Sequence, residues 1–298
     1  MRLGVVILPE HPWAQGQEIW ERAEEIGFDH AWTYDHLAWR SLRDSTWFAT
    51  MPTLAAAALA TTTMRIGTLV ASPNVRGPVA LARDVITLDD LSGGRFTLGI
   101  GAGGPGWDTT MLGGEELEPA ERADRFEEFV ELTDRLLREP PVDFDGAHYT
   151  AIDVPMAPGC VQTPRVPFVI AATGPRGFRL VARHGQAWVS TGDGAGGQGA
   201  GGDGLGPADG ADVIRRQTAR LDAACAEVGR DPATVDRCVL LGFGLRADLD
   251  SAEVLRDLLG HYGEAGITDV IVHWPRPAEP FAGDRTHFEQ VIATVTGA

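Results

Sequence analysis

The sequence predicts a closed (β/α)8 barrel, an α/β fold of the TIM-barrel class, on two observations. Short apolar runs alternate with longer amphipathic stretches along all 298 residues, a pattern typical of parallel strands joined by helices. The alternation contains eight strand-then-helix units, and eight units favour a closed barrel over an open, doubly wound sheet. Because one barrel commonly occupies this length, we expect residues 1–298 to form a single domain.

The expected strands are short runs rich in apolar and β-branched residues. In chain order they are residues 3–8, 30–34, 65–70, 96–101, 167–171, 187–190, 238–242 and 268–273. Active sites of barrel enzymes lie at the carboxyl ends of the strands. The residues that follow each strand are therefore the candidates for function.

Between the strands, apolar residues recur at the spacing that lines one face of a helix. The expected helices are residues 15–26, 52–60, 79–91, 119–137, 177–184, 211–228, 252–262 and 285–295.

Two insertions interrupt the alternation, one after the fourth helix and one after the sixth strand. Residues 140–160 contain the stretch from Phe144 to Tyr149, which is typical of a hairpin turn. Residues 192–210 hold ten Gly in 19 positions, so we expect a flexible Gly-rich loop at the barrel mouth. A surface insertion and an active-site lid both remain open for this loop.

The charge balance excludes several classes of protein. The chain has 25 Arg and no Lys, against 42 acidic residues, and its formal net charge is −17. Without Lys it cannot form a Schiff base through an ε-amine or supply a phosphate-loop lysine. Such an acidic chain is a poor partner for nucleic acid or an anionic membrane.

The remaining composition indicates a cytoplasmic protein without a metal. Cys160, Cys225 and Cys238 are scattered and form no CxxC motif, which favours a reducing compartment and no zinc site. No HxH or HExxH motif occurs, so we expect no metal ligands. No apolar run reaches 18 residues, and the apolar part of the N-terminus is too short for a signal peptide.

Asp35 and His36 are the sharpest polar pair at the predicted mouth, directly after the second strand. A His beside a carboxylate can serve as a general acid or hold a cofactor ring. It can equally do no more than hydrogen-bond a loop. Trp39 lies three residues on and favours a ring-lined pocket, which supports the functional interpretation.

Two glycine-containing turns could bind a ligand. The stretch from Gly99 to Gly104 has the spelling of a dinucleotide fingerprint, but the next helix begins too late for that motif. The turn from Thr173 to Gly177 joins a strand to a helix, where free backbone N–H groups can bind phosphate. An ordinary strand-to-helix turn is the alternative for this second stretch.

The chain resembles the bacterial luciferase-like superfamily of flavin and deazaflavin oxidoreductases, and within it the actinobacterial branch that uses coenzyme F420. The matching stretches are AEEIGFDHAWTYDH at 23–36, RIGTLVASP at 65–73, LDDLSGGRFTLGIGAG at 88–103 and PFVIAATGPRGFRLVARHGQAW at 167–188. The four stretches occur in the order of the family and are spread over most of the chain.

The resemblance implies a cofactor site. Asp35 and His36 match the family pair that contacts the deazaflavin ring, with His36 assisting hydride chemistry as proton donor or ring anchor, positioned by Asp35. Trp39 lies where a substrate-side Trp is expected, and a non-proline cis peptide behind the ring is expected at Leu69–Val70. The family's phosphate-binding turn matches residues 171–176. The implied cofactor-binding residues are Leu69, Val70, Ser72, Ala102, Gly103, Ala171, Ala172, Thr173, Gly174 and Arg176.

Two departures from the family bear on the substrate. Sugar-phosphate dehydrogenases of this family carry a catalytic Glu after the fourth-strand glycine motif, where this chain has Gly103 to Gly106, and they hold the substrate phosphate with Lys. Both departures count against a sugar phosphate as the substrate.

Three hypotheses of function therefore stand. The first is an F420-dependent oxidoreductase that moves a hydride between C5 of the deazaflavin and a small organic substrate. The second is an FMN-dependent monooxygenase that uses oxygen. The third is a deazaflavin-binding protein without turnover. The resemblance also implies a homodimer.

Because the net charge is strongly negative, a phosphate-bearing cofactor needs local attraction. We expect Arg40, Arg43, Arg76 and Arg176 to supply it near the mouth, with backbone N–H groups binding the phosphate.

Overall fold

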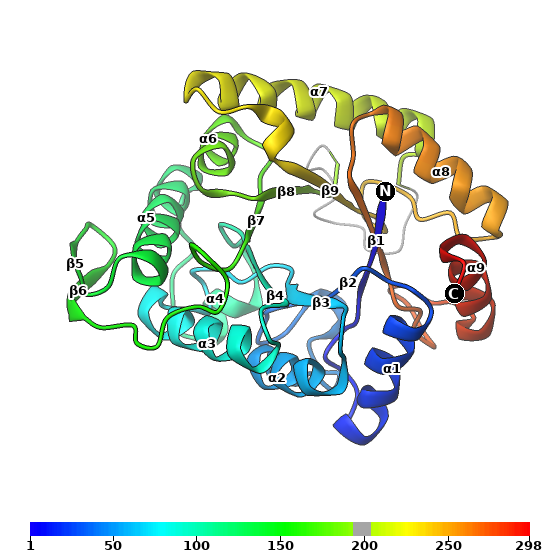
Figure 1. Cartoon of the computed structure of the whole chain (residues 1–298), viewed down its shortest axis with the longest axis horizontal. Coiled ribbons are helices and arrows are strands. Elements are labelled where there is room, and N and C mark those ends of the chain that lie inside the picture. The colour runs from blue at the N-terminus through cyan, green and yellow to red at the C-terminus, as the bar shows by residue number, and fades with distance from the viewer. Residues whose placement is uncertain (193–203) are drawn as a thin grey trace. The chain divides into compact units, whose positions relative to one another are not determined.

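The computed structural model describes residues 1–192 and 204–298 and is drawn in Figure 1. Within these residues, the barrel strands are β1 (Arg2–Val6), β2 (His30–Thr33), β3 (Arg65–Thr68), β4 (Phe96–Ile100), β7 (Phe168–Ala171), β8 (Ala187–Ser190), β9 (Asp236–Leu240) and β10 (Asp269–His273). They form a closed barrel in the order β1-β10-β9-β8-β7-β4-β3-β2, in which β1 pairs parallel with β10 and β2, β9 with β10 and β8, and β4 with β3 and β7. The predicted (β/α)8 barrel is confirmed.

The helices that follow the barrel strands agree with the predicted ones to within four residues at each end. They are α1 (Trp13–Glu25), α2 (Thr50–Ala60), α3 (Pro78–Leu91), α5 (Pro119–Arg138), α6 (Pro175–His184), α7 (Pro207–Glu227), α8 (Ala252–Glu264) and α9 (Arg285–Thr296). Four of them begin with Pro, whose missing N–H costs nothing in a first turn. The side chains of Ser251 and Asp284 cap α8 and α9.

Among residues 1–192 and 204–298, three short helices were not predicted. They are η1 (Arg40–Leu42), α4 (Trp107–Met111) and η3 (Pro232–Thr234). A single turn is too short to show apolar periodicity, so the sequence carries no signal for it. The helix α4 matters for the candidate site, because it holds Asp108, which contacts His36.

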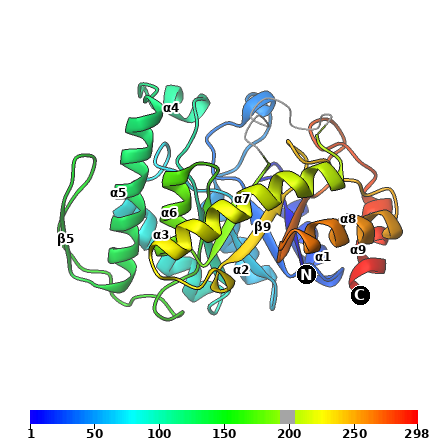
Figure 2. The same ribbon diagram turned by 90° about the horizontal axis from the view of Figure 1, so that it is seen from above.

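The predicted hairpin turn is confirmed. β5 (Val142–Asp145) pairs antiparallel with β6 (Thr150–Val154), and the turn between them is held by Glu128 on α5. The Glu128 carboxylate accepts hydrogen bonds from the backbone N–H groups of Ala147 and His148, each at 2.9 Å. Figure 2 shows the hairpin extending beside α5.

The Gly-rich stretch begins and ends in ordered structure. Residues 193–203 lie outside the described residues, so the predicted flexible loop and its possible role as a lid stay predictions for that part. The expected start of the next helix at residue 211 is wrong, because α7 begins at Pro207 and includes the last residues of the stretch. Gly206 is the extended N-cap of α7, and Pro207 is its first residue. Proline at this position is typical of a helix start, but it was not recognised among the surrounding glycines.

The described chain divides into two compact units. The first comprises Met1–Ile7, Glu18–Trp32 and Ala172–Ala298, and the second comprises Leu8–Gln17 and Thr33–Ala171. Within the described residues, no helix is both long and apolar enough to cross a membrane.

In the first unit, a buried ionic network stabilises the strand ends. The Asp269 carboxylate accepts hydrogen bonds from Arg2 at 2.7 Å and contacts the His30 ring at 3.0 Å. Burial works against this charge, but the hydrogen bonds from His30 and Arg2 outweigh it and hold the pKa of Asp269 well below its usual range. A Cβ at Gly4 would lie 2.0 Å from the His30 ring, so only Gly fits beside this network.

In the second unit, β3 and β4 approach each other closely. A Cβ on Gly99 would lie 1.9 Å from the Thr68 carbonyl oxygen, and the Thr68 hydroxyl donates a hydrogen bond to the Gly99 carbonyl at 2.7 Å. The Gly motif at the end of β4 therefore has a packing role as well as any role in ligand binding.

Candidate active site

His36 lies just beyond the end of β2 and is held by Asp108. The Nδ1 atom of His36 is 2.6 Å from Oδ2 of Asp108, and the other carboxylate oxygen accepts the backbone N–H of Leu37 at 2.8 Å. Asp108 is buried in the first turn of α4, whereas about a third of the His36 side chain is exposed. A carboxylate only accepts hydrogen bonds, so Nδ1 carries the hydrogen and Nε2 of the neutral ring is left as an acceptor.

Asp35 is engaged elsewhere. Its carboxylate is fully buried and receives two hydrogen bonds from the Arg76 guanidinium, at 2.9 and 2.7 Å. This bidentate pair raises the pKa of Arg76, chiefly through the hydrogen bond with Asp35. Asp84 lies 3.7 Å from the same guanidinium, and burial raises the pKa of its carboxyl group.

The expectation that Asp35 positions His36 is therefore wrong. Neighbouring residues at a strand end point to opposite sides, because side chains alternate along an extended chain. Asp35 turns into the protein toward Arg76, and the carboxylate beside His36 comes from α4, 72 residues later in the chain.

Aromatic rings surround the backbone of this turn. Trp39 is buried, with its ring centre 5.2 Å from that of Tyr34 and 6.4 Å from that of Trp47, to which it is nearly parallel. The Trp47 indole N–H donates to the His36 carbonyl at 2.8 Å. Burial raises the pKa of Tyr34 well above its usual value, so this phenol stays protonated. These rings pack against one another, and the ring-lined pocket that Trp39 suggested stays a prediction.

The segment after β3 carries the expected cis peptide. The bond between Leu69 and Val70 is cis and involves no proline. The Val70 side chain lies against the backbone of Gly101, because a Cβ on Gly101 would be 2.7 Å from Val70 Cγ2. Ser72 is buried, and its carbonyl accepts the Arg76 backbone N–H at 3.0 Å, so the turn that carries Ser72 also positions Arg76.

The segment after β4 is rich in glycine. Gly103 has a positive φ of 70°, and a Cβ there would lie 2.7 Å from the Asn74 amide. The Asn74 amide donates to the Gly104 carbonyl at 2.9 Å. A Cβ at Gly104 or Gly106 would meet nothing within 4 Å. Ala102, at the start of this stretch, is half-buried. Asn74 packs against Gly103, whereas the space beside Gly104 and Gly106 is empty.

The expected phosphate-binding turn is divided between the units. Ala171 ends β7 in the second unit, and the residues from Ala172 to Arg176 belong to the first. The Ala172 carbonyl accepts the Trp188 indole N–H at 2.8 Å, and Thr173 is exposed. Gly174 is the extended N-cap of α6, where a Cβ would meet nothing, and Arg176 lies in the first helical turn.

Of the four arginines expected to attract an anion, Arg76 does not fit. Its guanidinium is bound by Asp35, so the prediction that it gathers a phosphate is wrong. Arg43 pairs with Asp44 at 3.3 Å and lies over the Trp107 ring at 4.6 Å. Arg40 lies over Trp39 at 5.2 Å, and burial lowers its pKa. The role of Arg176 stays a prediction.

No group of three or more His, Cys, Asp or Glu side chains suited to a metal ion occurs among residues 1–192 and 204–298.

The model of the luciferase-like monooxygenase family matches residues 1–290. The chain belongs to this family. The resemblance seen in four short stretches therefore extends over residues 1–290 of the 298.

Two curated relatives have activities that their names state. The chain is 35% identical over 208 residues to an F420-dependent glucose-6-phosphate dehydrogenase of Beutenbergia cavernae, covering 67% of this chain and 59% of that enzyme. It is 29% identical over 246 residues to the 4-hydroxyprotoasukamycin monooxygenase of Streptomyces nodosus subsp. asukaensis, covering 78% of this chain and 61% of that one. The chain spans about half to three fifths of the length of the curated relatives it matches.

Solved structures agree on the fold. An F420-dependent secondary alcohol dehydrogenase in complex with an F420–acetone adduct superposes with a TM-score of 0.80 at 18% identity, over 99% of this chain and 97% of that one. At this identity the likeness shows the luciferase-like barrel and nothing about the ligand.

Asp108 is the residue that sequence reasoning missed in this luciferase-like site. It lies five residues beyond Gly103, in the helical turn that the sequence did not predict, and no spacing rule connects it with His36. The sequence showed that this chain lacks the Glu expected after the fourth-strand glycine motif of sugar-phosphate dehydrogenases. It did not show that Asp108 lies beside His36.

Proposed function

We propose that this luciferase-like protein is an F420-dependent oxidoreductase and that His36 is its proton donor. The observation that carries the proposal is the contact between His36 and Asp108, because it combines a partly exposed imidazole with a buried carboxylate beyond the carboxyl end of β2. The relationship to an F420-dependent dehydrogenase over two thirds of the chain supports the choice of cofactor.

The deazaflavin would supply or accept the hydride, and the chain must manage the accompanying proton. Asp108 holds Nδ1 of His36 in the protonated state, so Nε2 is the nitrogen that gives or takes a proton. Because the side chain is partly exposed, solvent can restore that proton after each turnover. The double contact of Asp108, to the ring and to the Leu37 backbone, fixes the direction in which Nε2 points.

The residues present fit a planar cofactor with a phosphate. In the second unit, Gly104 and Gly106 each leave room that a side chain would fill. In the first unit, Gly174 and the first turn of α6 offer backbone N–H groups, which suit an anion. We assign the ring to Leu69, Val70, Ser72, Ala102 and Gly103, the phosphate to Ala171, Ala172, Thr173, Gly174 and Arg176, and contact with the substrate to Trp39.

A cofactor titration tests the proposal. Quenching of protein fluorescence should show that F420 binds at least tenfold more tightly than FMN. Deazaflavin absorbance should then change when the loaded protein meets a panel of alcohols, aldehydes and enones. No affinity for F420 would end the proposal. Binding without any absorbance change would leave only a deazaflavin-binding protein.

The monooxygenase relative favours a second candidate, an FMN-dependent monooxygenase on the same barrel. In that case the purified protein would be yellow, FMN would bind more tightly than F420, and reduced flavin with substrate would consume oxygen. Since a barrel of this type can serve either cofactor, the titration and not the fold distinguishes them.

The remaining parts of the proposal concern substrate and assembly. We propose a small-molecule substrate other than a sugar phosphate, because the chain has no Lys for the phosphate. We also propose a cytoplasmic homodimer. Light scattering of the purified protein tests the dimer, which would have twice the 31.8 kDa mass of one chain.

A further inference from the structure

The first unit contains a cavity that the proposed proton donor does not use. It has a volume of about 370 Å³ and lies beyond the carboxyl ends of β9 and β10. The segment from Pro275 to Asp284 and the first turn of α9 complete its wall. This volume is enough for a molecule of one ring and a short side chain.

The base of the cavity is aromatic and uncharged. The His273 ring lies flat on Phe281, with ring centres 3.5 Å apart and planes 8° from parallel, and Phe288 contributes a further buried ring. Burial lowers the pKa of His273 to about 3, so its imidazole is neutral at physiological pH. One ring nitrogen hydrogen-bonds the Leu241 backbone.

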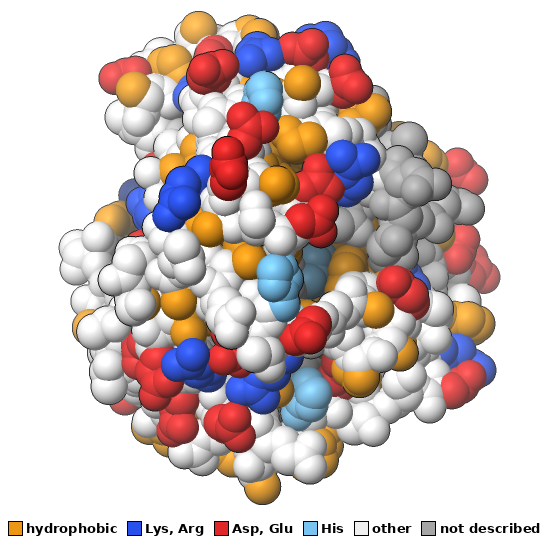
Figure 3. Space-filling model, turned by 90° about the vertical axis from the view of Figure 1, so that its right-hand side faces the viewer, with side chains coloured by type: hydrophobic (Ala, Val, Ile, Leu, Met, Phe, Trp, Pro, Cys, Tyr) orange, Lys and Arg blue, Asp and Glu red, His pale blue; other side chains and the backbone are white. Residues whose placement is uncertain are grey.

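Carboxylates dominate the rim of the cavity. Asp250, Glu279 and Asp284 line it and are exposed, and within the described residues neither Asp250 nor Glu279 has an ion-pair partner. Arg246 also lines the cavity, but Asp248 engages its guanidinium with two hydrogen bonds at 2.5 and 2.8 Å. The rim therefore presents an unbalanced negative charge. Figure 3 shows histidine side chains in a recess flanked by acidic ones.

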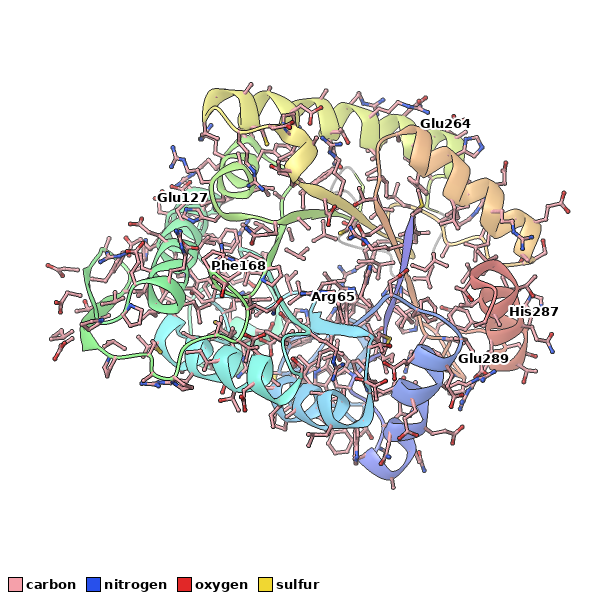
Figure 4. The ribbon with its side chains drawn as sticks, in the orientation of Figure 1. Arg65, Glu127, Phe168, Glu264, His287 and Glu289 are labelled. Carbon is pink, nitrogen blue, oxygen red and sulfur yellow. The ribbon has the colours of Figure 1, made fainter. Side chains whose placement is uncertain are left out.

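The rim is held in place by contacts that leave these carboxylates available. His287, labelled on α9 in Figure 4, hydrogen-bonds the backbone carbonyl of Asp250 at 3.0 Å. The Asp284 side chain caps α9 by accepting the His287 backbone N–H at 3.0 Å. The Arg276 guanidinium binds the Ala278 and Pro280 carbonyls, which braces the segment that carries Glu279.

We propose that this cavity binds a small organic cation, a planar apolar ring that carries an ammonium or amidinium group. The ring would stack on the flat pair of His273 and Phe281, and the cationic group would meet the carboxylates of Asp250 and Glu279. The carboxylates of Asp250, Glu279 and Asp284 at the rim carry negative charge and accept hydrogen bonds, which suits a cationic donor and disfavours a phosphate or carboxylate. The binding of this cation does not rest on the proposed function.

Calorimetry with the full chain, without F420, tests the proposal. Phenethylamine and phenylacetate share a ring and a similar length and differ in charge. We expect the amine to bind at least tenfold more tightly than the acid, with an affinity that falls as salt is added, and glucose 6-phosphate not to bind.

Matched variants locate the effect. Asp250→Asn together with Glu279→Gln should weaken amine binding about fivefold or more, since exposed carboxylates contribute modestly each. The control is Glu253→Gln together with Asp257→Asn on α8, which removes the same charge away from the cavity and should leave binding unchanged.

Equal affinity for amine and acid, or an equal loss in both double variants, would overturn the cation site. Amine binding in a protein that fails to bind F420 would instead contradict only the proposed function. The two failures are therefore distinguishable.

Discussion

Two histidines stand at the carboxyl ends of barrel strands in opposite surroundings. His36 follows β2, is about one third exposed and contacts a buried carboxylate. His273 ends β10, is almost wholly buried, stacks on a phenylalanine and has a pKa lowered to about 3 by burial. The same residue type at the same kind of position thus serves two purposes.

The difference shows that position in a barrel is not enough to assign a role. Exposure and a carboxylate partner allow His36 to exchange a proton with solvent, whereas desolvation keeps His273 neutral and makes it a flat surface. A histidine at a strand end becomes a candidate acid only when its partner and its access to water are known. Four predictions test this contrast.

The largest effect is expected from His36→Ala. Loss of a general acid typically costs 10²- to 10⁴-fold, so kcat with F420 and substrate should fall by about that factor. Affinity for F420 should change little. The control is His261→Ala on α8, whose ring is exposed and 3.6 Å from Asp257. A kcat within threefold of the original protein would remove His36 from the chemistry.

The next effect concerns stability. Arg76→Ala leaves the buried Asp35 carboxylate without its partner, and breaking such a pair costs about 3 kcal/mol of unfolding free energy. Urea denaturation measures it. Arg215→Ala, which breaks an exposed pair with Asp212, should cost less than about 1 kcal/mol. If both variants lose the same amount, the pair of Asp35 and Arg76 is not the buried anchor described above.

His273 should make stability depend on pH. Its pKa is about 3 in the folded chain and 6.5 when unfolded. Below pH 6.5 the unfolded chain binds a proton that the folded chain does not, so stability falls as pH falls toward 3. Between pH 7 and pH 5 this contribution is about 2 kcal/mol. In His273→Gln the loss over that interval should be smaller by this amount, as denaturation at the two pH values would show.

The smallest effect is expected from Asp108→Asn. The amide keeps an oxygen for the Leu37 N–H but offers no charge to His36, so kcat should fall about tenfold, the low end for a charged hydrogen bond. The acidic limb of the pH–rate profile should move as well, which a purely structural change would not cause. An unchanged profile together with a reduced kcat would make Asp108 structural only.

Much of the fold was readable from local pattern. The eight strands and their helices were predicted because apolar periodicity and start signals such as Pro119 and Ser251 are local properties. The helices that were not predicted are single turns, which have too few residues to show an apolar periodicity. They include α4, the turn that contains the partner of His36.

The candidate site was readable only in part. Residues that follow strands, such as His36, Trp39 and the bond between Leu69 and Val70, could be located because chain order and the family resemblance place them. Their partners could not. Asp35 was assigned to its neighbour His36 and in fact binds Arg76. Arg76 itself, expected from charge alone to attract an anion, is therefore already paired.

The linear sequence was sufficient for the barrel, the family and the exclusion of lysine chemistry, because these depend on residue type, order and spacing. The folded chain was needed for the pairing of Asp108 with His36 and for the neutral, stacked state of His273. These depend on distance and desolvation between segments remote in sequence. A shift of a few ångströms in packing changes both the distance and the desolvation, and no local pattern of residues encodes such a shift.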